Sequence, residues 1–253
     1  MSQPPSQSDT THFGFRTVSA KEKQKLVGSV FTSVARRYDV MNDLMSLGIH
    51  RIWKRFYVAI AQVKPGDCVL DLAGGTGDIA RLLHRRVGPE GTIVLGDINP
   101  QMLATGRDRL IDRGIVAAMH YIQCNAERLP FPDHCFDLVT MSFGLRNVTD
   151  KQAALREMYR VLKVGGQAHI LEFSHVRAAW FRPLYDAHCF HVLPRLGRLI
   201  ANDADSYQYL AESIRQHPPQ ETLKTMMEQA DFGLCRYKDL SGGIVAIHSG
   251  YKL

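Results

Sequence analysis

Short apolar runs alternate with longer amphipathic segments over much of the chain, beginning at about residue 68. Five runs have the length and the β-branched content of buried strands: residues 68–73, 92–98, 119–126, 137–143 and 168–173. Helix-length stretches separate them. Strands that alternate with helices are typical of βαβ units, in which helices cover both faces of a parallel sheet. The pattern therefore predicts an α/β fold.

Local signals at several helix ends agree with this pattern. Asn99 and Pro100 supply a capping side chain followed by a proline at the first helical position. Thr149 and Gln152 have the spacing of a capping box, which would open a helix that ends near Lys163. The glycines at 165–166 are expected to stop that helix before the next strand.

The segments on either side of this core have different patterns. Residues 20–62 predict two or three helices that pack over one edge of the sheet. Residues 175–215 are helical in pattern and rich in aromatic and basic side chains, so they predict a folded insertion rather than a structureless loop. A further helix at 218–231 and a hairpin at 235–251 are expected after it. The predicted organisation is a disordered tail at 1–10, a helical cap at 11–62, and a main domain at 63–253 with an inserted lid at about 175–216.

The composition restricts the possible partners without choosing among them. The 253 residues are 45% hydrophobic and 22% charged, which is ordinary for a folded domain, and the formal net charge is +6. A basic protein favours nucleic acid, an anionic membrane surface or an anionic small ligand. Apolar runs stay well short of the ~20 residues needed to cross a bilayer, so any membrane contact is expected at the surface.

The cysteines and histidines indicate neither a disulfide framework nor a metal site. The five cysteines are Cys68, Cys124, Cys135, Cys189 and Cys235, an odd number without a CxxC pair. We interpret most of them as small core residues in a reduced, cytoplasmic compartment. His188 and His191 flank Cys189, but no second pair of ligands has metal spacing, so no metal is expected.

The most specific motif is a glycine-rich loop between a strand and a helix. Residues 71–78 contain Gly74, Gly75, Thr76 and Gly77 at the turn. Glycines let the backbone approach a ligand closely, and the following helix N-terminus directs amide donors at it. Asp97 ends the second strand, 20 residues beyond Gly77, where an acid in dinucleotide-type folds accepts hydrogen bonds from both ribose hydroxyls. No GK[ST] sequence follows, which excludes a P-loop, but on these two features a nicotinamide enzyme remains open.

Two further features favour a methyltransferase. Asn125 and Ala126 end the third strand, and the fourth strand runs into Ser142. Together with the glycine loop and Asp97, this order resembles the class I S-adenosylmethionine-dependent methyltransferases. The resemblance implies that the glycine loop packs on the methionine part of the cofactor and that Asp97 holds its ribose. It also implies that Asn125 and Ala126 flank the adenine, and that Ser142 faces the cofactor. The fold implied is Rossmann-like, with a seven-stranded, mostly parallel sheet of order 3-2-1-4-5-7-6 whose last strand is antiparallel.

The resemblance extends to one family within this class. The segments that carry it are THFGFRTV (11–18), YDVMNDLMSLGIHRIWK (38–54), DLAGGTGD (71–78), SFGLRNVTD (142–150), FHVLPRLG (190–197), NDADSYQYLAESI (202–214) and the C-terminal SGYKL. They are similar to the ubiquinone/menaquinone biosynthesis C-methyltransferases, over nearly the whole chain past residue 10. The resemblance implies methylation of a ring carbon of a polyprenylated benzoquinol or naphthoquinol. Ala73 and Val164 depart from the glycine and proline usual in the class, and we expect only a slightly altered turn. Methylation of another small molecule or of RNA, and a non-catalytic role, remain alternatives.

Methylation at carbon needs an electron-rich ring, which a phenolate supplies. Ionising a hydroxyl of pKa ~10 at pH 7 costs roughly 4 kcal/mol. A cation about 4 Å away returns on the order of 4 kcal/mol at an effective dielectric constant of about 20. The sequence position and the family resemblance make Arg146 the candidate for this cation and Asn147 the candidate for orienting the ring hydroxyl. Tyr38 is a candidate contact to substrate or cofactor.

Two of these candidate residues also have a purely structural interpretation. Arg146 would then tether its loop through an ion pair, without touching the substrate. Asp71 is a second candidate cofactor ligand, but it would otherwise brace the glycine loop by accepting backbone N–H groups. Asp150 is better explained as a charge in the first helical turn than as a reacting group.

Two stretches combine basic and aromatic side chains: residues 50–57 and 177–199. They are interpreted either as amphipathic helices packed on the domain or as an interfacial surface whose aromatic rings enter the lipid headgroup region. A polyprenyl substrate resides in the bilayer, so a peripheral position on the inner face of the cell membrane would explain its delivery. Nucleic acid is not expected, because the chain contains neither an RNA-binding module nor a base-methylation motif of the NPPY type. A homodimer and membership of a quinone-biosynthesis complex are both left open.

Overall fold

The computed structural model describes residues 10–34, 38–177, 182–187, 192, 195 and 204–253. The predicted tail, apart from Thr10, lies outside these residues, as do His188, Cys189 and His191. The elements in chain order are β1 (Thr10–Phe13), β2 (Arg16–Ser19), α1 (Ala20–Val34), α2 (Tyr38–Ser46), α3 (His50–Ile60), β3 (Cys68–Leu72), α4 (Asp78–Val87), β4 (Thr92–Asp97), α5 (Pro100–Ile111), β5 (Met119–Gln123), β6 (Phe136–Ser142), the 3₁₀ turn η3 (Leu145–Asn147), α6 (Lys151–Val161), β7 (Leu162–Phe173), α7 (Arg182–Ala187), α9 (Ala204–Gln216), α10 (Gln220–Glu228), β8 (Gly233–Leu240), the 3₁₀ turn η6 (Ser241–Gly243) and β9 (Val245–Tyr251).

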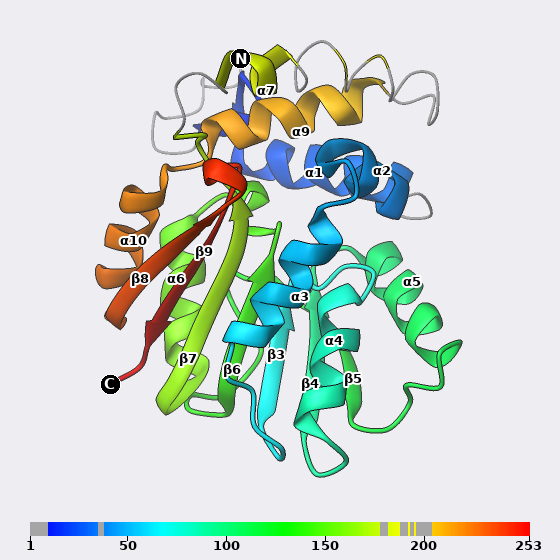
Figure 1. The fold of residues 1–253 in the computed structure, drawn as a ribbon, viewed down its shortest axis with the longest axis vertical. Coiled ribbons are helices and arrows are strands. Elements are labelled where there is room, and N and C mark those ends of the chain that lie inside the picture. The colour runs from blue at the N-terminus through cyan, green and yellow to red at the C-terminus, as the bar shows by residue number, and fades with distance from the viewer. Residues whose placement is uncertain (1–9, 35–37, 178–181, 188–191, 193–194, 196–203) are drawn as a thin grey trace, which may run out of the picture.

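A seven-stranded sheet runs through the middle of the molecule (Figure 1). Its order is β5-β4-β3-β6-β7-β9-β8. Strands β3 to β7 pair in parallel, and β9 runs antiparallel between β7 and β8. Counted from β3 as the first strand, this confirms the predicted order and the antiparallel last strand. The connections change direction between β3 and β6, and ligands bind beyond the carboxyl ends of the strands at such a switch point.

Helices cover both faces of this sheet, which explains why its strands are apolar along nearly their whole length. On one face α3, α4 and α5 pack on β3 and β4 through side chains such as Leu83 and Leu95. On the other face α6 packs on β6 and β7, through side chains such as Val139 and Leu155, and α10 packs on β8 and β9. All four of these side chains are 0% exposed. The two faces thus give two buried clusters that hold the sheet.

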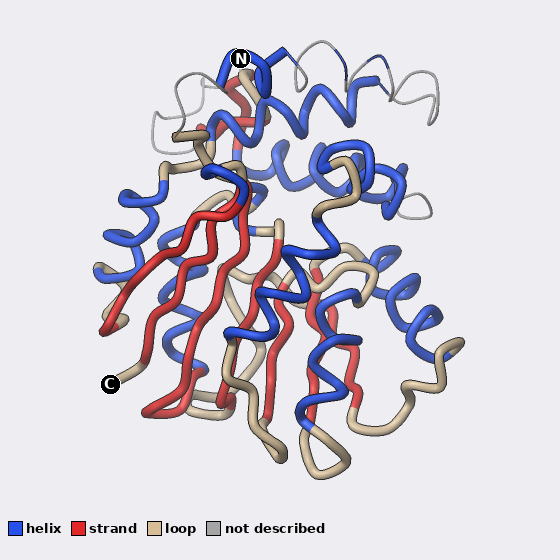
Figure 2. The backbone as a smooth tube through the Cα atoms, in the orientation of Figure 1, coloured by secondary structure: helices blue, strands red, loops and turns tan. Residues whose placement is uncertain are grey.

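A further layer of helices lies over the carboxyl edge of the sheet (Figure 2). It contains α1, α2 and α9, and α9 belongs to the predicted insertion. A hairpin of β1 and β2 precedes α1, although a purely helical cap was expected there. The ring of Phe13 in this hairpin stacks on Tyr209 of α9, with centroids 4.1 Å apart. The N–H of Phe15 donates to Glu212 of the same helix. The hairpin therefore closes on α9, which lies far away in the sequence.

Some predicted helix boundaries are correct and others are wrong. Asn99 caps α5, since its side-chain oxygen accepts from the N–H groups of Gln101 and Met102. The cap of α6, however, is Asp150 and not Thr149: the Asp150 carboxylate accepts from the N–H of Ala153 at 2.8 Å. The glycines at 165–166 do not stop this helix but lie within β7. They pair with the backbone of Lys252 just beyond β9, which extends the sheet past them.

The aromatic side chains of residues 50–57 point into the protein. Trp53 is 4% exposed and Tyr57 is 0% exposed. The indole N–H of Trp53 donates to the Ser241 hydroxyl at 2.9 Å, and the Tyr57 hydroxyl donates to the carbonyl of His169 at 2.6 Å. The inner face of α3 therefore packs on the domain, as the amphipathic-helix interpretation has it, and lipid contact of its outer face stays a prediction. Most of the second basic stretch, 177–199, lies outside the described residues.

Candidate active site

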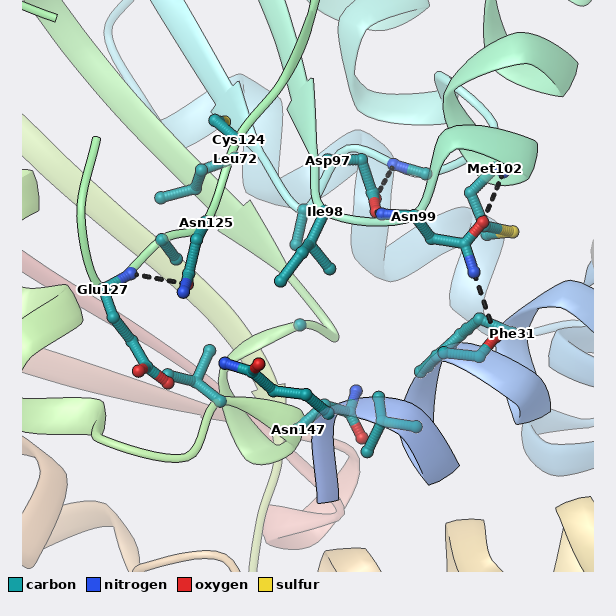
Figure 3. Close-up of a pocket in the computed structure, with 18 of the residues that line it drawn as sticks. Phe31, Leu72, Asp97, Ile98, Asn99, Met102, Cys124, Asn125, Glu127 and Asn147 are labelled. Atoms are coloured by element: carbon teal, nitrogen blue, oxygen red, sulfur yellow. Dashed lines mark hydrogen bonds between the residues drawn. The ribbon is translucent and has the colours of Figure 1, made fainter. Parts of the chain in front are cut away.

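A cavity of about 290 Å³ lies at the carboxyl ends of β3, β4, β5 and β6, beneath α1 (Figure 3). The ends of β3 and β4, the segments that directly follow β5 and β6, and α1 form its wall. The lining residues are Gln24, Val27, Gly28, Phe31 and Thr32 of α1, then Leu72, Ala73, Gly75, Asp97, Ile98, Asn99, Pro100, Met102, Cys124, Asn125, Ala126, Glu127, Phe143, Gly144, Asn147, Val148 and Thr149. The cavity therefore forms at the switch point between β3 and β6.

The glycine loop forms one side of the cavity, and its shape depends on left-handed backbone at two glycines. Gly75 has a φ of 53°, and Gly77, which precedes α4, has a φ of 81°. A side chain is also excluded from Gly106 in α5, where a Cβ atom would lie 2.5 Å from the carbonyl oxygen of Gly75. Of the predicted loop residues, Gly75 lines the cavity, whereas Gly74, Thr76 and Gly77 shape the turn behind it.

Asp97 projects from the end of β4 toward the same loop. One carboxylate oxygen accepts from the N–H of Gly75 at 2.9 Å, and the other accepts from the N–H of Asn99 at 2.8 Å. The residue is only 8% exposed, and this burial raises the pKa of its carboxyl to about 6. Each oxygen retains a second lone pair. Asp97 is thus a fixed acceptor at the cavity wall, and its predicted role toward the ribose stays a prediction.

The contacts of Asp71 are those expected of a residue that braces the glycine loop. It is 0% exposed, and burial raises its pKa to about 7. Its oxygens accept from the N–H of Ala80 at 3.1 Å and from the hydroxyl of Thr140 at 2.9 Å. The side chain does not reach the cavity wall. These contacts tie the glycine loop to α4 and β6, and a direct role toward the cofactor stays a prediction.

The wall after β5 combines an amide with small and apolar groups. The Asn125 side-chain oxygen accepts from the N–H of Glu127 at 3.0 Å, which turns the chain back along the cavity. Glu127 in turn accepts the N–H of Thr149 at 2.9 Å. Ala126 and Ile98 also line the cavity, so apolar groups that can pack against a flat ring lie near the Asn125 amide.

Helix α1 closes the cavity and is fastened to both of its sides. The Asn99 amide nitrogen donates to the carbonyl of Gly28 at 3.1 Å and to the hydroxyl of Thr32 at 3.0 Å. On the opposite side, the ammonium group of Lys23 donates to the carbonyl of Val148 at 3.2 Å. The lining residues of α1 were missed at the sequence level. The sequence offered one local indication of a contact with α1. Asn99 uses only its side-chain oxygen to cap α5, so its amide nitrogen remains available to donate to another segment.

The loop after β6 contains the predicted catalytic residues in different surroundings. The Arg146 guanidinium is buried and forms an ion pair with Glu172 at 2.8 Å, while its backbone N–H donates to the other oxygen of Glu172. The guanidinium does not line the cavity, so its contacts are those of the tether interpretation. Asn147 does line the cavity, on the side opposite Asp97 (Figure 3). Ser142 ends β6 half-buried and outside the lining. Tyr38 begins α2, and its side chain is outside the described part of the chain.

Comparison with known proteins shows which family the chain belongs to. Residues 17–252 match the model of the ubiE/COQ5 methyltransferase family. The chain belongs to this family. It is 73% identical over 253 residues to the ubiquinone/menaquinone biosynthesis C-methyltransferase UbiE of Stenotrophomonas maltophilia (strain R551-3), covering 100% of both chains. Identity to the protein of the same name from Xanthomonas campestris pv. campestris is 74% over 253 residues, again covering 100% of both chains.

The fold comparison agrees with this assignment. A crystal structure of a SAM-dependent methyltransferase from Aquifex aeolicus aligns with a TM-score of 0.61 at 16% identity, covering 88% of this chain and 98% of that chain. At this level of identity the match concerns the fold alone. It confirms the Rossmann-like class I methyltransferase architecture that the sequence predicted.

S-adenosylmethionine is the cofactor of this methyltransferase family, and the cavity residues fit it. Asp97 presents a fixed, buried acceptor of the kind that ribose hydroxyls bind. Ile98 and Ala126 line the cavity and would flank the adenine, and Gly75 would permit close approach of the backbone on the methionine side. The cavity wall thus has the groups that each part of the cofactor would need.

Proposed function

We propose that this protein transfers a methyl group from S-adenosylmethionine to a ring carbon of a polyprenylated quinol in ubiquinone or menaquinone biosynthesis. The reactions are the conversion of demethylmenaquinol to menaquinol, and of 2-polyprenyl-6-methoxy-1,4-benzoquinol to its methylated product. The observation that carries the proposal is the identity of 73% and 74% over the full length to relatives named for this activity. The cavity with Asp97 at its wall supports it independently.

Some of the cavity residues would bind the methyl donor, and others would bind the quinol that accepts the methyl group. When bound, the cofactor supplies an electrophilic methyl group. Asp97, Asn125 and Ala126 would hold its nucleoside, and Asn147 would donate a hydrogen bond to the quinol oxygen from the opposite wall. Arg146 has two proposed roles: stabilisation of the phenolate by its charge, and support of the Asn147 loop through Glu172. The second role agrees with the ion pair that Arg146 forms with Glu172 in this structure. Tyr38 is retained as a proposed contact to substrate or cofactor.

The proposal is tested with the purified protein, S-adenosylmethionine and demethylated quinols carrying a prenyl chain. Mass spectrometry should find a product one methyl group heavier from a benzoquinol, a naphthoquinol or both. Cells that lack the protein should accumulate quinone precursors one methyl group short. A protein that binds S-adenosylmethionine but methylates neither ring class would contradict the proposal.

We also propose that the corner between α2 and α3 contacts an anionic membrane surface, from which a polyprenyl substrate would be drawn. Leu47 is 76% exposed, Ile52 is 64% exposed and Ile49 is 40% exposed. Leu47 has a φ of 50°, so a bulky apolar residue occupies a strained, solvent-exposed position with no core contact to explain it. The corner belongs to the helical layer above the cavity (Figure 1). Within the described residues, no helix has the length and apolar character to span a bilayer.

Replacing Leu47 by asparagine and Ile52 by glutamine should weaken binding to vesicles containing phosphatidylglycerol by about tenfold or more, since two aliphatic side chains no longer enter the lipid. Asparagine suits the left-handed backbone at residue 47, which limits any effect on folding. Cosedimentation measures the change. The control is Val116→Gln, because Val116 is 65% exposed but lies before β5, away from the corner. Equal losses in both variants would refute the assignment of the surface.

A further inference from the structure

One polar contact joins the inserted helix α9 to the cavity wall. The Tyr209 hydroxyl donates a hydrogen bond to the side-chain oxygen of Asn147 at 2.9 Å. Tyr209 is 3% exposed, so this bond is shielded from water. Asn147 lines the cavity, whereas Tyr209 does not. The phenol therefore lies behind the amide, on the side away from any ligand.

We propose that Tyr209 is a positioning residue for methyl transfer, which fixes the orientation of the Asn147 amide so that its N–H groups face the quinol oxygen. This inference rests on the proposed function and adds to it a residue from the insertion. It also assigns a purpose to the contact between α9 and the loop after β6.

The orientation of an amide matters because its two ends have opposite hydrogen-bonding character. The Asn147 oxygen can only accept, and its nitrogen can only donate. A quinol oxygen that gains negative charge during the reaction is stabilised by a donor and repelled by an acceptor. With the Asn147 oxygen engaged by Tyr209, the nitrogen is left for the cavity. Reversing the amide would deprive the buried phenol hydrogen of its acceptor, which corresponds to a penalty of roughly tenfold or more in population.

The surroundings of Tyr209 keep it in the role of donor. Burial raises the pKa of the Tyr209 hydroxyl, so it stays protonated at physiological pH. Its ring stacks on Phe13 with an interplanar angle of 11°, which fixes the plane of the phenol. Glu212, one turn further along α9, accepts the N–H of Phe15 and holds the same hairpin. The hairpin of β1 and β2 thus supports one face of the phenol ring, while the hydroxyl contacts Asn147.

The test is a double-mutant cycle with Tyr209→Phe and Asn147→Ala, measured as quinol methylation by the full-length protein. Tyr209→Phe keeps the ring and its stacking and removes only the hydroxyl. It should lower kcat about tenfold, the usual effect of losing one hydrogen bond, while the Kd for S-adenosylmethionine stays within about twofold. In the Asn147→Ala background the same change should alter kcat by less than about twofold, because the amide it orients is absent. Tyr159→Phe is the matched control, since the Tyr159 ring packs on Phe232, away from the cavity.

Each outcome of the cycle decides the matter. A tenfold loss from Tyr209→Phe in both backgrounds would show that the hydroxyl acts on packing rather than through Asn147, and would overturn the inference. Unchanged kcat in the Tyr209→Phe single variant would overturn it as well. If the wild-type protein methylates no quinol, the proposed function itself fails and the inference fails with it. If the wild-type protein methylates a quinol but the effects of Tyr209→Phe and Asn147→Ala are additive, the inference about Tyr209 is refuted and the proposed function is not.

Discussion

Replacement of Asp97 by asparagine is expected to weaken the binding of S-adenosylmethionine by about 100-fold. The carboxylate binds the N–H groups of Gly75 and Asn99 with one oxygen each, and both oxygens keep a lone pair for the ribose. Asparagine is uncharged and has a donor in place of one oxygen, so one ribose hydroxyl loses its acceptor and the other loses a charge-assisted hydrogen bond. Together these losses are about 3 kcal/mol, or two orders of magnitude in Kd.

Titration calorimetry measures this loss, and a second aspartate serves as the control. Asp137 lies at the amino end of β6 and accepts the N–H of Cys68 at 2.9 Å. Asp137→Asn should therefore affect stability but leave the affinity for S-adenosylmethionine within about twofold of wild type. Because burial raises the Asp97 pKa, its ionised form is a cost to the folded state above pH 4, and Asp97→Asn is not expected to unfold the protein. A wild-type Kd for S-adenosylmethionine in the Asp97→Asn variant would show that Asp97 does not bind the ribose.

The same carboxylate should make cofactor binding depend on pH. Burial raises the pKa of Asp97 from 3.8 to about 6 in the protein without ligand. The ionised form accepts ribose hydroxyls best, so affinity is full above about pH 6 and falls as pH decreases through that value, by up to about tenfold per unit. Asp97→Asn should abolish this component. Burial raises the pKa of Asp71 to about 7, so any pH dependence of cofactor affinity that comes from Asp71 would persist in the Asp97→Asn variant.

The sheet and the position of Asp97 at the cavity wall could be predicted from the sequence because their signals are local. The strands are short apolar runs, Asn99 directly precedes the helix that it caps, and Asp97 directly follows β4. The errors at the helix ends have the same local origin. Thr149 and Asp150 are both of a type that caps helices, and the Asp150 carboxylate is the one that accepts the N–H of Ala153. Glu127, more than 20 residues away in the sequence, accepts the N–H groups of both residues and fixes the chain that leads into the helix.

The substrate side of the cavity could not be predicted in this way, because its partners are distant in the sequence. Asn147 meets Tyr209, 62 residues away, and Arg146 meets Glu172, 26 residues away. No periodicity or spacing rule connects such pairs. The lining of α1 is of the same kind, since its contact to the sheet edge joins Asn99 to Thr32, 67 residues apart. Hence the sequence identified Arg146 as a candidate but left its partner and its orientation open.

Replacement of Arg146 by alanine is expected to lower the free energy of unfolding by 3–5 kcal/mol, on the order of 10 °C in Tm for a chain of this size. The cause is Glu172, which is 1% exposed and would lose its only guanidinium partner among the described residues. Breaking a buried ion pair leaves the remaining charge without compensation, whereas replacing both partners by apolar residues is often neutral. The double variant Arg146→Met with Glu172→Gln removes both charges and keeps a side-chain oxygen to accept the backbone N–H of residue 146, so it should recover most of the stability. Thermal or urea unfolding of the two variants measures the difference.

Turnover by the stable double variant separates the two proposed roles of Arg146. If the guanidinium only supports the loop that carries Asn147, quinol methylation should return to within about tenfold of wild type, because the loop is again held by packing. If its charge stabilises the phenolate, about 4 kcal/mol of stabilisation is missing and turnover should stay about a thousandfold low while S-adenosylmethionine still binds. The contacts favour the first result, since the Arg146 side chain is 2% exposed and its charge is compensated by Glu172 at 2.8 Å. A folded, cofactor-binding double variant with a thousandfold defect would instead require the guanidinium to leave Glu172 and turn toward the cavity during the reaction.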